Sequence, residues 1–106
     1  MKIRLFYTNL PFWRAEVCRL ALYMGKIEFE DVRMKWRDDF DMMINTGKLP
    51  NGLKSPFRQI PVMEVDGKMI GQTAGIARFC GKLSGLYPKN DDLLAAQIDQ
   101  IVDAAN

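Results

Sequence analysis

The chain of 106 residues contains no histidine. Without an imidazole ring neither a Ser-His-Asp triad nor a Cys-His nucleophile pair can form, and a zinc ion would have no histidine ligand. Cysteine is scarce as well, because Cys18 and Cys80 are the only two and they form no CxxC motif. We therefore expect no metal centre and two reduced thiols, as in an intracellular protein, with a single disulfide as the open alternative.

Long apolar runs are also missing. The opening segment MKIRLFYTNLPFWRAE lacks the apolar core of a signal peptide, and no stretch approaches the ~20 apolar residues of a membrane span. No basic run carries interleaved aromatic residues, which is the usual pattern of a nucleic-acid-binding segment. These absences predict a cytoplasmic protein with no membrane span and no nucleic-acid partner.

The composition is that of a globular domain. Hydrophobic residues make up 48% of the chain and charged residues 26%, with a formal net charge of +2. This share of apolar side chains can form a sizeable core, which argues against intrinsic disorder. The length leaves little room for two full domains.

Apolar periodicity predicts the first two elements. Alternation over residues 2–8 indicates a strand, and residues 13–24 have helical spacing between the start signal Pro11 and the stop signal Gly25. The predicted buried face of this helix consists of Val17, Leu20, Ala21 and Met24. The charged side chains off that face are Arg14, Glu16 and Arg19.

The remaining elements follow from the same signals. A second strand is expected over residues 27–34, a short helix over 36–45, and a loop after it. Asp66-Gly67 suits a tight hairpin turn between strands over residues 60–65 and 68–71. The helix from Thr73 has the apolar set Ile76, Phe79, Cys80 and Leu83. The final helix, from Asp91, has the stripe Leu94, Ile98, Ile101, Val102 and Ala105, which something must cover.

This order of elements predicts an α/β fold. A strand-helix-strand crossover, a hairpin and a helix form a thioredoxin-like βαβ-ββα sandwich with a four-stranded mixed sheet, followed by one extra C-terminal helix. Residues 1–88 would form this domain, and residues 89–106 would begin a purely helical one. A thioredoxin needs a cysteine at the start of the first helix, and because residues 9–13 contain none, Cys18 and Cys80 are interpreted as small core residues.

Three segments resemble a known family. YTNLPFWRAE, FRQIPVMEVDG and GQTAGIARFCGKLSGLYP are similar to the N-terminal domain of cytosolic glutathione transferases, most nearly the tyrosine-dependent sigma class. The resemblance covers essentially the whole chain and implies glutathione as co-substrate. It also implies a further all-helical domain that supplies most of the electrophile pocket and much of the dimer contact.

The resemblance implies that a hydroxyl at the end of the first strand activates glutathione. Tyr7 would donate a hydrogen bond to the thiolate, which lowers the pKa of the thiol. The family has an Arg-Gly pair before the residues that match Arg14-Ala15-Glu16, and counting back from Arg14 places Thr8 in the tyrosine position. We prefer Tyr7, because loops tolerate an extra residue better than strands do, and keep Thr8 as the fallback. Alternatively, Tyr7 is only a core tyrosine.

Two further segments are implied to bind the peptide. Gln59-Ile60-Pro61 matches the place where a cis proline presents the backbone of the preceding residue to the cysteinyl part of glutathione, although it could be an edge-strand proline. Gln72-Thr73 opens a helix, whose free N–H groups favour the γ-glutamyl carboxylate, unless Thr73 is only a helix cap.

The other implied contacts are charged or aromatic. For the rest of the peptide, including its glycine carboxylate, the candidates are Arg14, Trp36 and one of Lys48 and Lys54, although a solvated loop charge is the alternative for either lysine. Asp99 matches the aspartate that reaches across a dimer to the neighbour's ligand, or it is a surface charge.

Two classes of function remain. The first is a glutathione transferase, or its N-terminal part, that activates glutathione for attack on small hydrophobic electrophiles, as a homodimer or with a partner chain covering the last helix. The second is a non-catalytic interaction module or accessory subunit with the same fold. A glutathione-dependent isomerase would use the same residues as the transferase.

Overall fold

The computed structural model describes residues 1–10 and 13–105. Its centre is a four-stranded sheet in the order β2-β1-β3-β4. The strands are β1 (Ile3–Thr8), β2 (Glu30–Met34), β3 (Val62–Val65) and β4 (Lys68–Ile70). Strand β1 is parallel to β2 and antiparallel to β3, and β4 is antiparallel to β3. The predicted mixed sheet and α/β fold class are therefore confirmed.

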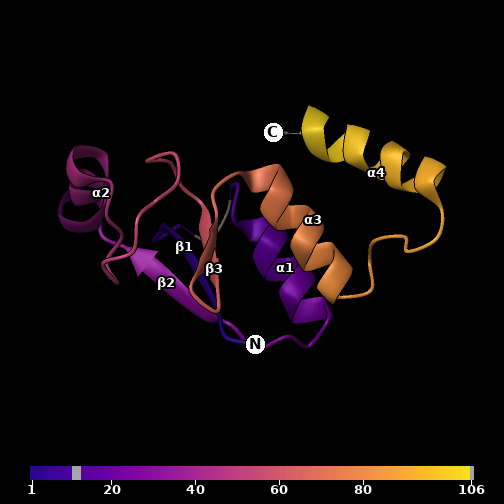
Figure 1. Cartoon of the computed structure of the whole chain (residues 1–106), viewed down its shortest axis with the longest axis horizontal. Helices are drawn as coiled ribbons and strands as arrows, with labels where there is room; N and C mark the ends of the chain where they lie inside the picture. Colours follow the sequence, from indigo (N-terminus) through magenta and orange to yellow (C-terminus); the bar gives the residue numbers. More distant parts are fainter. Residues whose placement is uncertain (11–12, 106) are drawn as a thin grey trace.

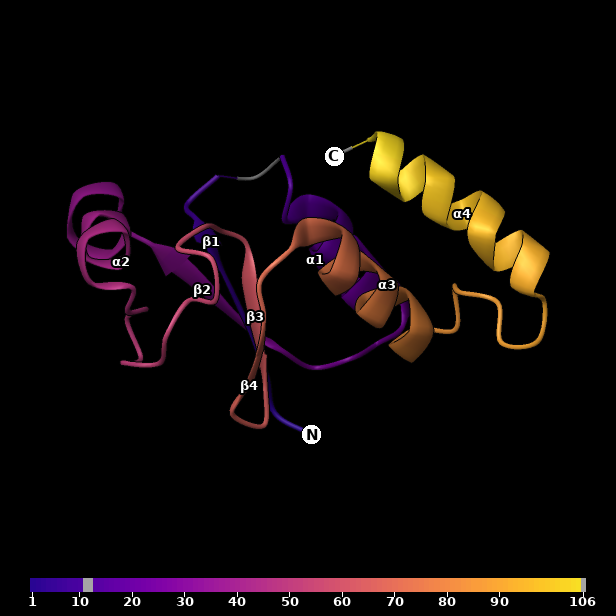
Figure 2. The same ribbon diagram turned by 45° about the horizontal axis from the view of Figure 1, so that its top comes forward.

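Helices cover both faces of this sheet (Figures 1 and 2). Helices α1 (Glu16–Met24) and α3 (Thr73–Leu83) lie side by side on one face, and the π-helical turn η1 (Trp36–Phe40) with α2 (Asp41–Thr46) lies on the other. The alternation of β1 separates two cores. Ile3, Leu5 and Tyr7 pack toward α1 and α3, whereas Phe6 packs toward α2.

The hairpin turn has the predicted geometry. Asp66 has φ 49° and Gly67 has φ 85°, the two positive values of the tight turn that matches the twist of antiparallel strands. Two strands are shorter than predicted. Strand β3 of the hairpin begins at Val62, and strand β2 begins only at Glu30. The start signal Pro11 lies outside the described residues.

The predicted buried face of α1 is wrong. Val17, Leu20 and Met24 are more than half exposed, and Ala21 is only partly buried against the core. The buried face instead consists of Ala15, Cys18, Arg19 and Leu22. Helix α3 packs on this second stripe, so tertiary packing decides between two faces that apolar spacing alone does not distinguish well.

Cys18 and Cys80 lie in the core between α1 and α3. Both are free thiols with no exposed surface, which confirms their interpretation as small core residues. A hydrogen bond that the Cys18 thiol donates to Cys80, together with burial, raises the pKa of the Cys18 thiol well above its usual range. Cys18 therefore stays protonated, and the two buried cysteines pack as small apolar groups.

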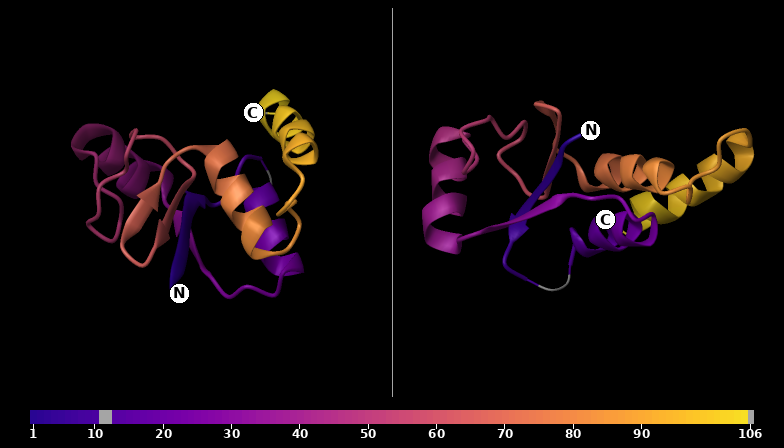
Figure 3. Two further views of the ribbon diagram at one scale, coloured as in Figure 1. Left: turned by 45° about the vertical axis from the view of Figure 1, so that its right-hand side comes forward. Right: turned by 90° about the horizontal axis from the view of Figure 1, so that it is seen from below.

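Helix α4 (Asp92–Ala104) stands beyond α3, on the side away from the sheet (Figures 1 and 3). Asp91 caps it by accepting a hydrogen bond from the Leu94 backbone N–H at 3.0 Å. The helix contains no fully buried residue, and Ile101 on its predicted apolar stripe is 67% exposed. Across the described residues, none of the helices has the length and apolar character that a membrane crossing requires.

Candidate functional site

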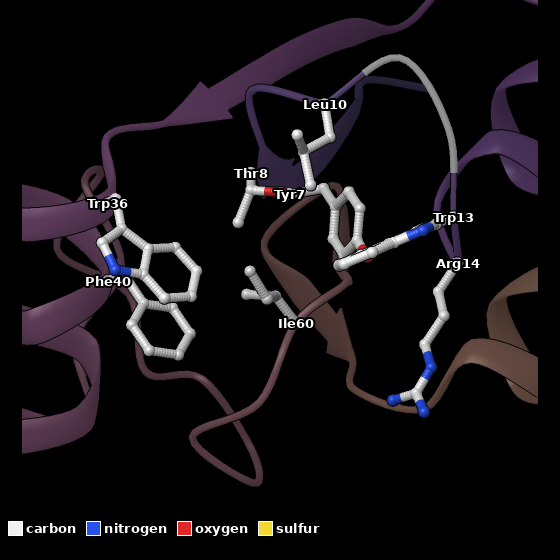
Figure 4. A pocket seen from close by; sticks show the side chains of 8 residues that line it. All are labelled: Tyr7, Thr8, Leu10, Trp13, Arg14, Trp36, Phe40 and Ile60. Carbon is white, nitrogen blue, oxygen red and sulfur yellow. The ribbon is translucent and has the colours of Figure 1, made fainter.

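A pocket of about 360 Å³ opens where β1 ends (Figure 4). In open sheets ligands bind at the carboxyl ends of the parallel strands, and β1 and β2 are the parallel pair here. Five predicted site residues line this pocket together: Tyr7, Thr8, Arg14, Trp36 and Ile60. The structure thus gathers residues that are as far as 53 positions apart in the sequence.

Tyr7 combines a core position with a pocket position. Its side chain is 5% exposed and belongs to the same core cluster as Ile3 and Leu5, as the core alternative predicts. It also lines the pocket, and Figure 4 shows the hydroxyl at the end of the ring nearest Trp13. A rigidly held ring therefore presents a donor at the pocket.

Thr8 contributes a second hydroxyl. It pairs with Met34 of β2 and is 8% exposed. Its Oγ1 is buried and makes no hydrogen bond with any other residue that the structure describes. Leaving such a group unpaired costs free energy, so a ligand that reaches Oγ1 would be favoured.

Arg19 lies beneath Tyr7, although the helical pattern placed it off the buried face. It is 7% exposed, and its Cζ lies 5.8 Å from the centre of the Tyr7 ring. Its Nε donates to Asp31 at 3.1 Å, and one NH group donates to the Leu10 carbonyl, also at 3.1 Å. These bonds tie α1, β2 and the loop after β1 together around the tyrosine. The ring face that meets the guanidinium is electron-rich, which makes the contact attractive.

Aromatic side chains form the opposite walls. Trp36 and Phe40 stack with 4.6 Å between ring centres and 3° between ring planes, and both line the pocket on the side across from Trp13 (Figure 4). The pocket also contains Leu10, Trp13 and Phe40, which the sequence did not predict as site residues. The four-residue spacing of Trp36 and Phe40 was the available signal, because such positions meet on one helical face.

The segment before β3 leaves backbone groups at the pocket. The strand ladder of β3 ends with Val62 opposite Phe6, so Ile60 lies beyond the paired register. The Ile60–Pro61 peptide bond is cis, as the resemblance implies. Ile60 lines the pocket, and an extended peptide placed there could use its backbone as an added strand does.

The two glutamines meet at the start of α3. Gln72 Nε2 donates to Gln59 Oε1 at 3.3 Å. Gln72 is the cap residue of α3 and Thr73 the first helical residue, and no side-chain hydrogen bond caps the helix. The alternative that Thr73 serves only as a cap is thus not supported, and neither side chain lines the pocket of Tyr7.

The remaining candidates lie elsewhere. Lys48 and Lys54 pair with each other as an isolated antiparallel bridge and do not line the pocket. Asp99 accepts hydrogen bonds at 2.8 Å from both Arg78 and Tyr87 of its own chain. Arg78 first, and Tyr87 second, hold the pKa of the Asp99 carboxyl below its ordinary value. Asp99 therefore fastens α4 to α3.

The fold and the pocket define a thioredoxin-like domain. No family model matches the chain. Glutathione S-transferase 2 of Caenorhabditis elegans is 38% identical over 88 residues, which are 83% of this chain and 42% of that protein. Hematopoietic prostaglandin D synthase of Gallus gallus is 35% identical over 103 residues, 94% of this chain and 47% of that protein.

A solved structure gives the same result. The glutathione S-transferase from Ascaris lumbricoides superposes with a TM-score of 0.80 at 32% identity, over 97% of this chain and 45% of that one. In both sequence and fold the chain matches the thioredoxin-like domain of the glutathione transferases, which confirms the resemblance. It spans less than half the length of each of these proteins.

Proposed function

We propose that the chain is the glutathione-binding part of a glutathione transferase, which activates the thiol of glutathione for attack on small hydrophobic electrophiles. One observation carries this proposal: a single pocket at the end of β1 is lined by Tyr7, by Arg14 and by Ile60, whose backbone lies beyond the paired register of β3. These groups suit the thiol, the backbone and a carboxylate of a small anionic peptide.

Tyr7 would activate the thiol. The thiol of glutathione loses its proton to solvent, and the remaining thiolate accepts a hydrogen bond from the phenol, which lowers the pKa of the thiol. The thiolate then forms a C–S bond with the electrophilic carbon, and the displaced electron pair leaves with the leaving group or takes up a proton. Thr8 is the fallback donor, since it lines the same pocket and its Oγ1 has no hydrogen-bond partner among the described residues.

The peptide would extend from this thiol in two directions. Gln59, Gln72 and Thr73 lie beside the N-terminus of α3, where free N–H groups favour the γ-glutamyl carboxylate. Arg14 and Trp36, which line the pocket, would hold the other end together with Lys48 or Lys54.

The partners follow from the surface of α4. Its apolar stripe is largely exposed, and burying such a face is favourable. We propose that residues 89–106 begin a helical domain, and that a homodimer or partner chain covers part of it, with Asp99 near a neighbour's ligand. The assignment to the sigma class and to the cytoplasm belongs to the same proposal, and the two free thiols support the latter.

The exposed apolar face of α1 favours a second candidate. Val17, Leu20 and Met24 form a stripe whose side chains are each more than half exposed, as expected of a non-catalytic interaction module. The two candidates differ in whether glutathione binds at the pocket of Tyr7. A glutathione-dependent isomerase would use the same pocket as the transferase and differ only in its second substrate.

A titration followed by nuclear magnetic resonance tests the proposal. The nitrogen-labelled chain is titrated with reduced glutathione, and the backbone signals of Thr8, Ile60 and Gln72 and the indole signal of Trp36 are expected to shift together with one saturation curve. Signals of α4, such as that of Gln100, serve as the internal reference. Unchanged signals at the pocket with millimolar glutathione would contradict the transferase and favour the interaction module.

A further inference from the structure

Trp13 has an unusual backbone for so large a residue. Its φ is 80°, in the left-handed region that bulky side chains rarely adopt. The side chain is 66% exposed and belongs to neither core cluster. Strained conformations of this kind persist where the surrounding structure enforces them, and they gather at functional sites. The packing of the core does not explain a tryptophan here.

The position of Trp13 offers another explanation. Trp13 lines the pocket of Tyr7 and also a second groove of about 490 Å³ between α1, α3 and α4. Figure 4 shows the indole extending toward Tyr7 from the start of α1, with the Trp36–Phe40 pair on the far side of the pocket. The indole is therefore the wall that the thiol-activating pocket and the groove share.

The groove is suited to an apolar group. Besides Trp13 and Arg14, it is lined by the aliphatic side chains Val17, Ala77, Ile101, Val102 and Ala105. A group attached to the sulfur of a glutathione bound at Tyr7 would enter this groove past the indole. Aromatic rings stack on one another in offset or edge-to-face geometry with a gain beyond their buried area, so the wall distinguishes a flat ring from an alkyl chain of similar size.

We propose that Trp13 is a specificity-determining residue, whose indole stacks on an aromatic ring of the electrophile and so favours aromatic over aliphatic co-substrates. The proposal rests on the proposed function, because it needs glutathione bound beside Tyr7. It assigns the preference to one side chain and leaves the activation of the thiol to another.

Binding of two conjugates tests this without requiring turnover. The probes are S-(dinitrophenyl)glutathione, which carries a flat ring, and S-hexylglutathione, which carries an alkyl chain, with glutathione itself as the reference. Trp13→Leu is expected to weaken calorimetric binding of the dinitrophenyl conjugate by about threefold to tenfold, with less than about a twofold change for the other two ligands. Trp13→Phe should restore the preference, and Tyr23→Leu on the exposed side of α1 should change nothing.

The outcomes separate the two proposals. Equal weakening of both conjugates by Trp13→Leu, or no weakening, would overturn the role of Trp13 while glutathione binding still supports the transferase. A wild-type chain that binds none of the three ligands would overturn both. Trp13→Gly guards against a folding artefact, because glycine accepts a φ of 80° without strain. This variant should keep or raise the melting temperature and still lose the preference for the ring.

Discussion

Replacing Tyr7 with phenylalanine removes one oxygen atom and leaves the ring. The ring is buried in the core with Ile3 and Leu5, so its packing is retained. No hydrogen bond joins the hydroxyl to another residue among those described, so the substitution leaves no partner unsatisfied inside the protein. We expect the free energy of unfolding to change by less than about 1 kcal/mol.

The effect on the bound thiolate should be much larger. A hydrogen bond to a charged acceptor contributes about 1.5–3 kcal/mol, and 1.36 kcal/mol corresponds to a change of one in a pKa. Tyr7→Phe should therefore raise the pKa of the bound glutathione thiol by about 1 to 2. At a pH below the pKa of the wild-type complex the thiolate fraction then falls about tenfold to a hundredfold, and a conjugation rate there would fall by ~10². Glutathione affinity should stay nearly intact.

The thiolate absorbs in the ultraviolet, so a pH titration of the complex measures its pKa directly. Tyr23→Phe is the matched control, because Tyr23 lies 79% exposed on α1 and loses the same oxygen. It should leave the thiol pKa unchanged. Equal thiolate in the wild type and in Tyr7→Phe would refute the role of Tyr7. In that case Thr8→Val should raise the thiol pKa instead, since Thr8 carries the other hydroxyl at the pocket.

Two further predictions concern the helices. Leu22→Ala should lower the free energy of unfolding by about 2–5 kcal/mol in a denaturant titration, because Leu22 is fully buried. Leu20→Ala on the exposed face should change it by less than about 1 kcal/mol. Equal losses in the two variants would contradict the buried face of α1. Arg78 and Tyr87 favour the charged form of Asp99 and so lower its pKa. Their contribution to the attachment of α4 is therefore fully present above the unfolded pKa of about 3.9. It is lost as the pH falls through the lower pKa of the folded state. Hydrogen exchange in α4 should accelerate in that acidic range. Asp99→Asn should accelerate it already at neutral pH, without changing the glutathione affinity of a monomer. Weaker glutathione binding by a dimer of this variant would instead support the contact across the dimer.

Local signals predicted much of the fold. Three features depend on neighbours in the sequence, and the structure confirms them. They are the Asp66-Gly67 turn, the buried face of α3 with Ile76 and Cys80, and the start of the last helix near Asp91. The face of α1 does not depend on neighbours alone. Its two apolar stripes differ little in spacing, and only α3, which lies about 60 residues further along the chain, decides in favour of Cys18 and Leu22.

The candidate site was predictable in part for the same reason. Alternation in β1 placed Tyr7 on an inward face at the end of the strand, and the structure brings it to a pocket with Ile60. Arg19 was missed because a buried charge is rare unless it is paired. Of its two carboxylate partners only Glu16 is near in the sequence, whereas Asp31 lies in another element. The role of Trp13 as a shared wall was hidden as well, since a positive φ at a non-glycine residue leaves no trace in apolar spacing.

The measurement that tests the central claim most directly is a calorimetric titration of the chain with reduced glutathione at neutral pH. Gln72→Ala removes the side chain that bonds Gln59 at the start of α3, and Gln100→Ala on the exposed surface of α4 is its matched control. We predict saturable binding that Gln72→Ala weakens and Gln100→Ala leaves unchanged. No heat of binding at millimolar glutathione, or equal binding by all three proteins, would contradict the glutathione site.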